Sequence, residues 1–244
     1  MGVFLLATVG FVGVHAIGLA ITKRPDEPTF SVTRAVISAG LVLLGFAALA
    51  EQWPNRFRAF MARHPTDDFA FLVSAMLAAA LVADFVWMVW RFARWRVPSR
   101  RDLLVHHAMA VPALAYAFDH RVGFGLIGVA ATTELMAVCS GVVATGRLRG
   151  RPELQALGRR CCIAVLIGWR IPVWLFLTIV SIRILANPAA RAGFTVEYSI
   201  LVATTILLCA LDVFWVAEMR ASLRESERAN GKPALILRAN EETR

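Results

Sequence analysis

Long apolar stretches joined by short polar connections constrain this chain more than any other feature. Seven of them approach the roughly 20 residues that an α-helix needs to cross a bilayer, namely residues 3–21, 30–50, 69–90, 103–118, 122–144, 161–185 and 197–217. Hydrophobic residues make up 58% of the sequence, which is high for a soluble domain. The pattern predicts an all-α integral membrane protein with seven transmembrane helices, the fourth of them short.

Basic residues are distributed unevenly between the two sides of these stretches. Nineteen of the 26 Lys and Arg residues fall within 23–34, 91–101, 147–160 and 220–244, on one side. The opposite connections hold Arg56, Arg58, Arg63, Arg121, Arg183 and Arg191. Cytoplasmic loops are enriched in Lys and Arg, so we expect the N-terminus outside and the C-terminus in the cytoplasm. This topology also accounts for the net charge of +9, and no nucleic-acid partner is expected.

Ionisable residues interrupt several of the apolar stretches. They are Asp84, His106, His107, Glu134, Arg170 and Asp212. A polar side chain within a bilayer is costly, so such residues indicate function by default. Each also has an ordinary structural interpretation, as a hydrogen bond between packed helices or as an ion pair.

The depth of each residue follows from the helical rise, measured from the flanking arginines. Asp84, the two histidines and Asp212 lie about 8–12 Å deep, while Arg170 and Glu134 lie about 15–20 Å deep. We therefore expect one polar layer near the cytoplasmic face and a deeper layer that can hold a Glu134–Arg170 pair. Together these layers predict a polar cavity that opens toward the cytoplasmic side.

The adjacent histidines cannot both face the cavity squarely, because neighbouring residues diverge by about 100° on a helix. We take His107 as the reactive imidazole and His106 as its support, with Asp84 or Asp212 orienting the ring. Trp174 follows Arg170 by one turn and is expected to stack on its guanidinium group. Glu134, Arg170 and Trp174 would then contact substrate. His15, a lone histidine in the first stretch, is interpreted as structural.

Prolines follow two of these sites. Pro112 leaves a backbone carbonyl free beside His107, and Pro172 does the same beside Arg170. Such breaks are tolerated where they are buried in protein or line a polar cavity. Packing kinks are the ordinary alternative.

Four segments resemble the TLC-domain family of membrane proteins, which includes the ceramide synthases. They are Asp84-Phe85, Leu104-Val-His-His107, Ala131-Thr-Thr-Glu134-Leu and the Arg170 helix followed by Leu211-Asp-Val-Phe-Trp215. The resemblance covers about residues 30–220. It implies a TLC-like membrane domain at residues 26–220, with residues 1–25 as an extra helix and 221–244 as a polar cytoplasmic tail. It implies a six-helix, barrel-like bundle around a polar cavity, in which acyl groups are transferred by the residues matching His106, His107 and Glu134.

The match to ceramide synthases themselves is incomplete. Their fuller motif has a His-Asp pair where this chain has Ala130 and Ala131. The chain is therefore more similar to the shorter TLC-domain proteins, whose activities touch phospholipid composition.

Three functions remain open on this basis. The first is a membrane lipid acyltransferase or transacylase that takes acyl-CoA or a phospholipid as acyl donor and holds no bound cofactor. The second is a non-catalytic protein that binds membrane lipids or regulates phospholipid composition. The third is a metal-dependent lipid hydrolase, which the diverging histidine pair and the loop positions of His64 and His120 disfavour because zinc needs convergent imidazoles. No metal is expected.

Overall fold

The architecture comes from a computed structural model, which describes residues 2–52, 68–120, 123–191, 193 and 195–241. Arg56, Arg58, Arg63, His64 and Arg121 lie outside the described residues. Within the described ranges the chain forms helices and no strands.

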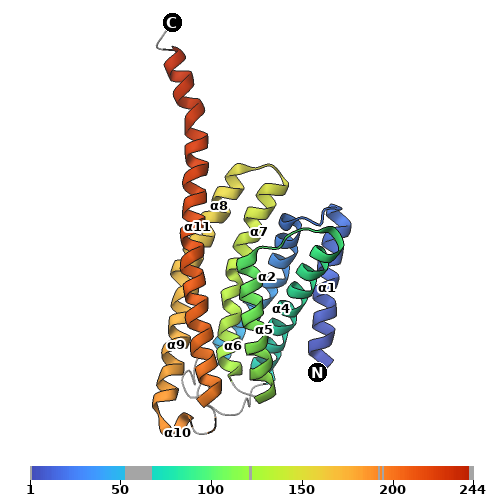
Figure 1. The fold of residues 1–244 in the computed structure, drawn as a ribbon, viewed down its shortest axis with the longest axis vertical. Coiled ribbons are helices and arrows are strands. Elements are labelled where there is room, and N and C mark those ends of the chain that lie inside the picture. Colours follow the sequence, from blue (N-terminus) through green and yellow to red (C-terminus); the bar gives the residue numbers. More distant parts are fainter. Residues whose placement is uncertain (1, 53–67, 121–122, 192, 194, 242–244) are drawn as a thin grey trace.

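The described residues form seven helical rods, which run alternately in opposite directions along the chain (Figure 1). They are α1 (Gly2–Thr22), α2 (Glu27–Gln52), α4 (Asp68–Trp95), α5 (Arg101–His120), α6 (Phe124–Ala131) continued by η2 (Thr132–Glu134) and α7 (Leu135–Leu148), α8 (Pro152–Val165) continued by η3 (Leu166–Arg170) and α9 (Ile171–Ala186), and α11 (Thr195–Glu241). A short helix, α10 (Pro188–Arg191), precedes the last rod. The rods correspond to the seven predicted stretches.

Six of these rods are long and apolar enough to cross a membrane. The exception is α5, whose first two turns hold Arg101, Asp102 and the two histidines. The last rod continues well beyond the bundle, since α11 remains helical to Glu241 through the segment expected to be a polar tail (Figure 1).

Polarity is distributed as in a membrane protein. Large apolar side chains such as Leu6, Leu43 and Phe214 are exposed on the outside of the bundle. Buried positions instead include Asp84, Arg170 and other polar residues. An apolar exterior of this extent is expected where lipid, not water, surrounds the helices.

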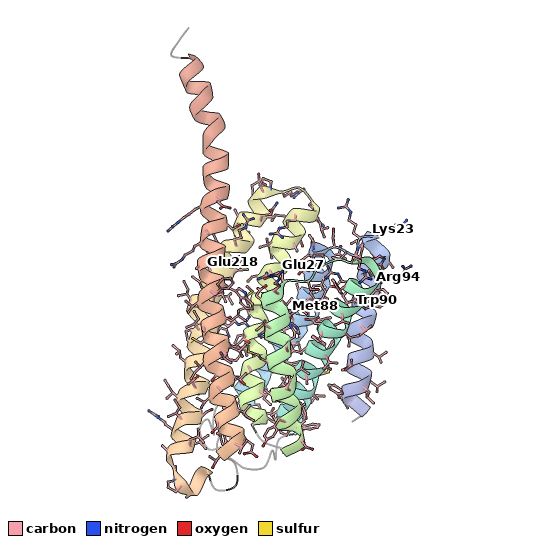
Figure 2. The ribbon with its side chains drawn as sticks, in the orientation of Figure 1. Lys23, Glu27, Met88, Trp90, Arg94 and Glu218 are labelled. Atoms are coloured by element: carbon pink, nitrogen blue, oxygen red, sulfur yellow. The ribbon has the colours of Figure 1, made fainter. Side chains whose placement is uncertain are left out.

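The arginine-rich end of the bundle is the end at which α1 and α4 finish and α5 begins. Figure 2 shows Lys23 and Arg94 there, with Glu27 nearby. Lys23 and Arg24 follow α1, Arg100 precedes α5, and Arg149 and Arg151 join α7 to α8. These charges mark one end of the rods, as the sequence predicts, and the bundle is compatible with a multi-pass membrane protein.

Neighbouring rods contact one another in a definite order. α1 packs against α4 and α2, α2 against α6, η2 and α7, and α7 against α8. On the other side α5 contacts α4 and α11, and α11 contacts α9. α6 contacts both α4 and α9. This arrangement surrounds the buried polar residues with helices.

Small residues allow the closest of these approaches. A β-carbon added at Gly158 of α8 would lie 2.7 Å from the backbone nitrogen of Val143 in α7. A β-carbon at Gly141 of α7 would lie 2.3 Å from Cβ of Ala35 in α2. Close backbone contact of this kind is a usual source of stability between helices in membranes.

We predict that Gly158→Ala lowers thermal stability although alanine favours helices more than glycine does. The added methyl group must separate α7 from α8, and overpacking of this kind costs about 1–3 kcal/mol. Thermal unfolding in detergent measures the change. Gly40→Ala is the matched control, because a β-carbon there meets nothing within 4 Å. Equal melting temperatures for the two variants would contradict the contact.

Candidate functional site

Asp84, a residue that is only 3% exposed, holds its carboxylate at the centre of the first polar group. His15 Nε2 on α1 lies 2.9 Å from Oδ1. On the other oxygen, Oδ2, Arg34 Nε of α2 lies at 2.9 Å and His107 Nε2 of α5 at 3.3 Å. Side chains from three helices thus surround one carboxylate of a fourth.

Arg34 links this carboxylate to Glu134. Its Nη2 lies 3.2 Å from Glu134 Oε2, and the Ser38 hydroxyl donates to the same oxygen at 3.1 Å. The predicted Glu134–Arg170 pair is therefore wrong, because Glu134 pairs with Arg34. Glu134 ends a short 3₁₀ turn that packs on α2, and this contact places its carboxylate beside Arg34.

Arg170 pairs with Asp212 instead, with 3.0 Å between Nε and Oδ2. Trp174 donates its indole N–H to the same carboxylate oxygen at 2.8 Å. The expected stacking is present, since the guanidinium carbon lies 5.7 Å from the Trp174 ring centroid, and it lies 5.1 Å from that of Trp215. The two aromatic faces add a favourable cation–π contribution to a buried charge.

A local distortion places Arg170 at this point. Residues Leu166–Arg170 form a π-helical turn immediately before Pro172, which is the second residue of α9. Proline cannot donate a backbone hydrogen bond, and π turns inserted into α-helices occur often at functional sites. The break expected from Pro172 therefore takes the form of a widened turn that ends at Arg170.

The two histidines diverge, with ring planes 86° apart and centroids 5.3 Å apart. His107 donates from Nδ1 to the carbonyl oxygen of Leu103 at 2.8 Å, and its Nε2 faces Asp84. Both of its nitrogens are therefore engaged. His106 turns the other way, toward Trp215 at 6.2 Å between centroids, and its buried Nδ1 has no hydrogen-bond partner.

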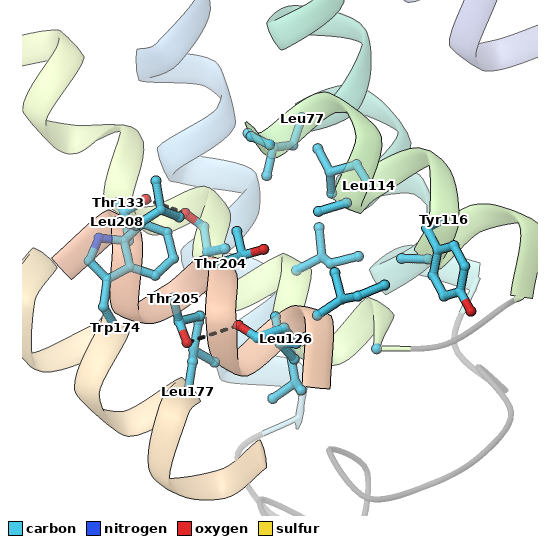
Figure 3. A pocket seen from close by; sticks show the side chains of 18 of the residues that line it. Leu77, Leu114, Tyr116, Leu126, Thr133, Trp174, Leu177, Thr204, Thr205 and Leu208 are labelled. Carbon is cyan, nitrogen blue, oxygen red and sulfur yellow. Dashed lines mark hydrogen bonds between the residues drawn. The ribbon is translucent and has the colours of Figure 1, made fainter. Parts of the chain in front are cut away.

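An apolar cavity of about 120 Å³ lies beside His106. Figure 3 shows leucines from four helices around it, Leu77, Leu114, Leu126 and Leu208. Its wall also includes polar residues, among them His106, Glu134, Trp174, Thr205 and Glu197. Tyr116 lines the cavity ten residues further along α5 than His106, or about 15 Å along the helix axis. The cavity is thus long enough for part of an acyl chain.

Two hollows at the arginine-rich end form what we call the arginine vestibule. The inner hollow, of about 30 Å³, is lined by Arg34, Arg100 and Arg170. The outer one, of about 350 Å³, is lined by Arg100, Arg147 and Arg159. Both hollows share Glu27, Ser31, Arg100 and Ser140. The vestibule therefore reaches the polar layer from the arginine-rich end, whereas the apolar cavity reaches it along α5.

Hydrogen-bonding capacity is left over in only part of the layer. Arg170 Nη2, Asp212 Oδ1 and His106 Nδ1 are buried without a hydrogen-bond partner. The Nε atoms of Arg34 and Arg170 face carboxylates at ion-pair distance without hydrogen-bond alignment. Because unpaired buried polar atoms are costly, the free atoms around Arg170 and His106 indicate a place where a polar ligand group fits.

No protein-family model matches the sequence, and no curated protein or solved structure matches it. The resemblance to the TLC-domain family therefore stays a prediction from the four segments. Within the part of the chain that the structure describes, no group of three or more His, Cys, Asp or Glu side chains could hold a metal ion. Function is therefore inferred from the buried polar residues and the cavities beside them.

Sequence reasoning missed three contributors to the site. Arg34 was counted among the connecting charges, although it lies inside the apolar stretch 30–50, and that position was the available signal. His15 was interpreted as structural, and its contact with Asp84 depends on a helix 69 residues away in the sequence. Trp215 was given no role in the site, but its ring centroid lies 5.1 Å from the guanidinium carbon of Arg170.

Asp102 supports the site at the arginine-rich end. It accepts hydrogen bonds from the Trp215 indole and the Arg100 guanidinium group. Burial raises the pKa of Asp102, but the hydrogen bond and charge of Arg100 outweigh burial, so the pKa lies below its ordinary value. The folded protein therefore favours the ionised carboxylate that holds Trp215 against Arg170.

We predict that Asp102→Asn lowers the melting temperature at neutral pH by about 2–4 °C. Because the pKa of Asp102 is lowered on folding, its stabilisation is present above the ordinary value and is lost as the pH falls below about 4. Melting curves between pH 3 and 7 should thus converge at the acid end. Glu225→Gln, exposed on α11, is the control, and a constant difference across this range would contradict the prediction.

Proposed function

We propose that this protein is a membrane lipid acyltransferase or transacylase, with an imidazole of the His106–His107 pair at its reactive centre. The observation that carries the proposal is the buried, unpartnered Nδ1 of His106, a residue that lines an apolar cavity. An acyl chain in that cavity would bring its carbonyl group to this nitrogen. Cavities that are mostly apolar with a few converging polar groups are the usual form of small-molecule sites.

The geometry favours His106 over His107 as the reactive imidazole, which reverses the roles expected from sequence. Both nitrogens of His107 are occupied, by Leu103 O and by Asp84. His107 then supports the site, with its ring edge-to-face against that of His106. In this assignment Asp84 acts through His107 and does not touch the substrate.

The proposed reaction transfers an acyl group from a donor ester or thioester to a hydroxyl or amine. His106 Nδ1 takes the proton of the acceptor as its oxygen or nitrogen attacks the donor carbonyl. The proton passes to the departing alkoxide or thiolate when the carbon–oxygen or carbon–sulfur bond breaks. One ester or amide is formed for each ester or thioester consumed, and the imidazole is regenerated.

Arg170 is suited to stabilise the charge that develops on the carbonyl oxygen. Its Nη2 is buried and unpartnered, and both it and His106 lie against the Trp215 ring. A preorganised donor in a site without water is among the largest contributions to catalysis. Asp212 and Trp174 hold this guanidinium group in place through the ion pair and ring contact.

The arginine vestibule would bind the phosphate groups of the donor, either acyl-CoA or an anionic phospholipid. Arginine pairs with phosphate through two parallel hydrogen bonds, and Arg100, Arg147 and Arg159 come from separate elements around one hollow. The headgroup would enter from the arginine-rich end while the acyl chain occupies the apolar cavity.

The six-helix, barrel-like core implied by the TLC resemblance is part of this proposal. Contacts that connect α4, α5, α11, α9, α6 and α2 in turn support it. The extra first helix would then be α1, which packs outside against α4 and α2.

A test uses the full-length protein in nanodiscs with isotope-labelled acyl-CoA or phospholipid, and mass spectrometry of the lipid products. We predict acyl transfer that His106→Ala reduces by about 100-fold or more. Val105→Ala is the matched control, since Val105 is adjacent on α5 and 52% exposed. Full activity in His106→Ala would remove this residue from the mechanism.

The runner-up is a protein that binds a lipid without turnover. It is favoured by the complete pairing around Asp84, which resembles a structural network. An intact lipid that co-purifies with the protein, together with no transfer from either donor class, would favour this second function over the first.

A further inference from the structure

The packing of α1 contains an anomaly. Among the described residues of this helix, His15 alone is fully buried, at 1% exposure, although nearly all its neighbours are apolar. The aliphatic residues Leu6, Val9 and Ile17 instead face outward. If α1 served only to cover the bundle, an aliphatic residue at position 15 would do so without burying a polar ring.

The imidazole of His15 is held in one plane and one position. It stacks on Phe30 and on Trp87, with 5.1 Å and 5.4 Å between ring centroids and interplanar angles of 30° and 21°. Gly18, one turn further along α1, makes this possible, because a β-carbon there would lie 2.1 Å from Cγ2 of Thr33. The glycine brings α1 close enough to α2 for His15 Nδ1 to reach Thr33 Oγ1 at 2.7 Å.

The tautomer of His15 follows from its partners. Asp84 Oδ1 can only accept when the carboxylate is ionised, so His15 Nε2 donates to it at 2.9 Å. In the neutral ring, Nδ1 can only accept, so it competes for the single Thr33 hydroxyl proton with the Phe30 carbonyl oxygen, which lies 2.9 Å from Thr33 Oγ1. The two sides of Asp84 thus have separate partners: His15 holds Oδ1, while Arg34 and His107 share Oδ2.

We propose that His15 is a positioning residue of the site: by holding Asp84 Oδ1, it fixes the carboxylate plane that orients His107. The connection runs from Thr33 through His15, Asp84 and His107 to the Leu103 carbonyl, and so joins α1, α2, α4 and α5. This inference rests on the proposed function for its consequence in turnover. Its structural part, the coupling of His15 to His107, stands independently of any reaction.

Removing His15 leaves Oδ1 of Asp84 buried without a donor. The carboxylate then gains from rotating, because Arg34 and His107 both lie on its Oδ2 side and an unpaired buried acceptor is costly. Rotation changes the contact at His107 Nε2, and with it the ring that packs against His106. The effect on an enzyme would appear in kcat more than in KM. None of the connected side chains, which are Thr33, His15, Asp84 and His107, is placed against substrate.

The test compares His15→Phe, His15→Gln and Thr33→Val in the full-length protein in nanodiscs. Phenylalanine keeps the stacking on Phe30 and on Trp87 but removes both hydrogen bonds, whereas glutamine can still donate to Asp84. Thr8→Val is the matched control, because Thr8 lies on the same helix and its hydroxyl donates only to its own backbone, at Phe4 O. The readouts are the ¹⁵N shifts of the His107 ring nitrogens, assigned with His107→Gln, and the kinetic constants of acyl transfer.

We expect His15→Phe to move the His107 Nε2 resonance and to lower kcat by about tenfold to hundredfold at unchanged KM. With His15→Gln, the His107 Nε2 resonance and kcat should remain close to those of the unaltered protein. Thr33→Val should change both quantities in the same direction as His15→Phe, but by less. If His15→Phe or Thr33→Val reduces thermal stability but leaves the His107 nitrogens and kcat as in Thr8→Val, the proposal is overturned. Shifted His107 resonances in a protein that transfers no acyl group would support the positioning role while refuting the proposed function.

Discussion

The buried carboxylate of Asp84 is the constraint on which the rest of the bundle depends. An ionised carboxylate in a low-dielectric interior is stable only when charge and hydrogen bonds compensate it. Here Arg34 supplies the charge, and His15 and His107 approach the two oxygens. Because these partners come from α2, α1 and α5, satisfying one side chain brings four helices to one point. Lipid-facing apolar surface gives no comparable specificity, since hydrocarbon tails are as apolar as leucine.

Much of the fold was predictable because a membrane imposes it. The length and polarity of the seven stretches predict seven helical rods, and the placement of arginines predicts which ends gather together. Individual partners were harder. Depth along the helix placed Glu134 and Arg170 together, but depth says nothing about which faces meet, and the pairs are Arg34–Glu134 and Arg170–Asp212. The divergence of the histidines was predictable from helical geometry, whereas which ring faces the cavity depends on how α5 is rotated against its neighbours.

The partner of His15 in the first helix could not be predicted from the sequence either. An apolar stretch with one histidine is a common pattern, and nothing in the stretch itself identifies the partner of His15. The partner becomes evident only from the contact with α4, whose Asp84 lies 69 residues further along the chain. Gly18 carried a usable hint, since a glycine one turn from a polar residue in a membrane helix indicates close approach of another helix.

The polar layer divides into a saturated part and an unsaturated part, and this division bears most directly on function. Around Asp84, each carboxylate oxygen has a partner. The imidazole rings of His15 and His107 each have a partner at both nitrogens. Around Arg170, a guanidinium nitrogen, a carboxylate oxygen and the His106 nitrogen are buried without one. A network that served stability alone would gain from closing these gaps. The residues that carry these atoms include His106 at the apolar cavity and Arg170 at the arginine vestibule. In the proposed function, the ester group of a lipid donor would supply the missing hydrogen-bond partners, with its acyl chain in the cavity and its phosphate in the vestibule.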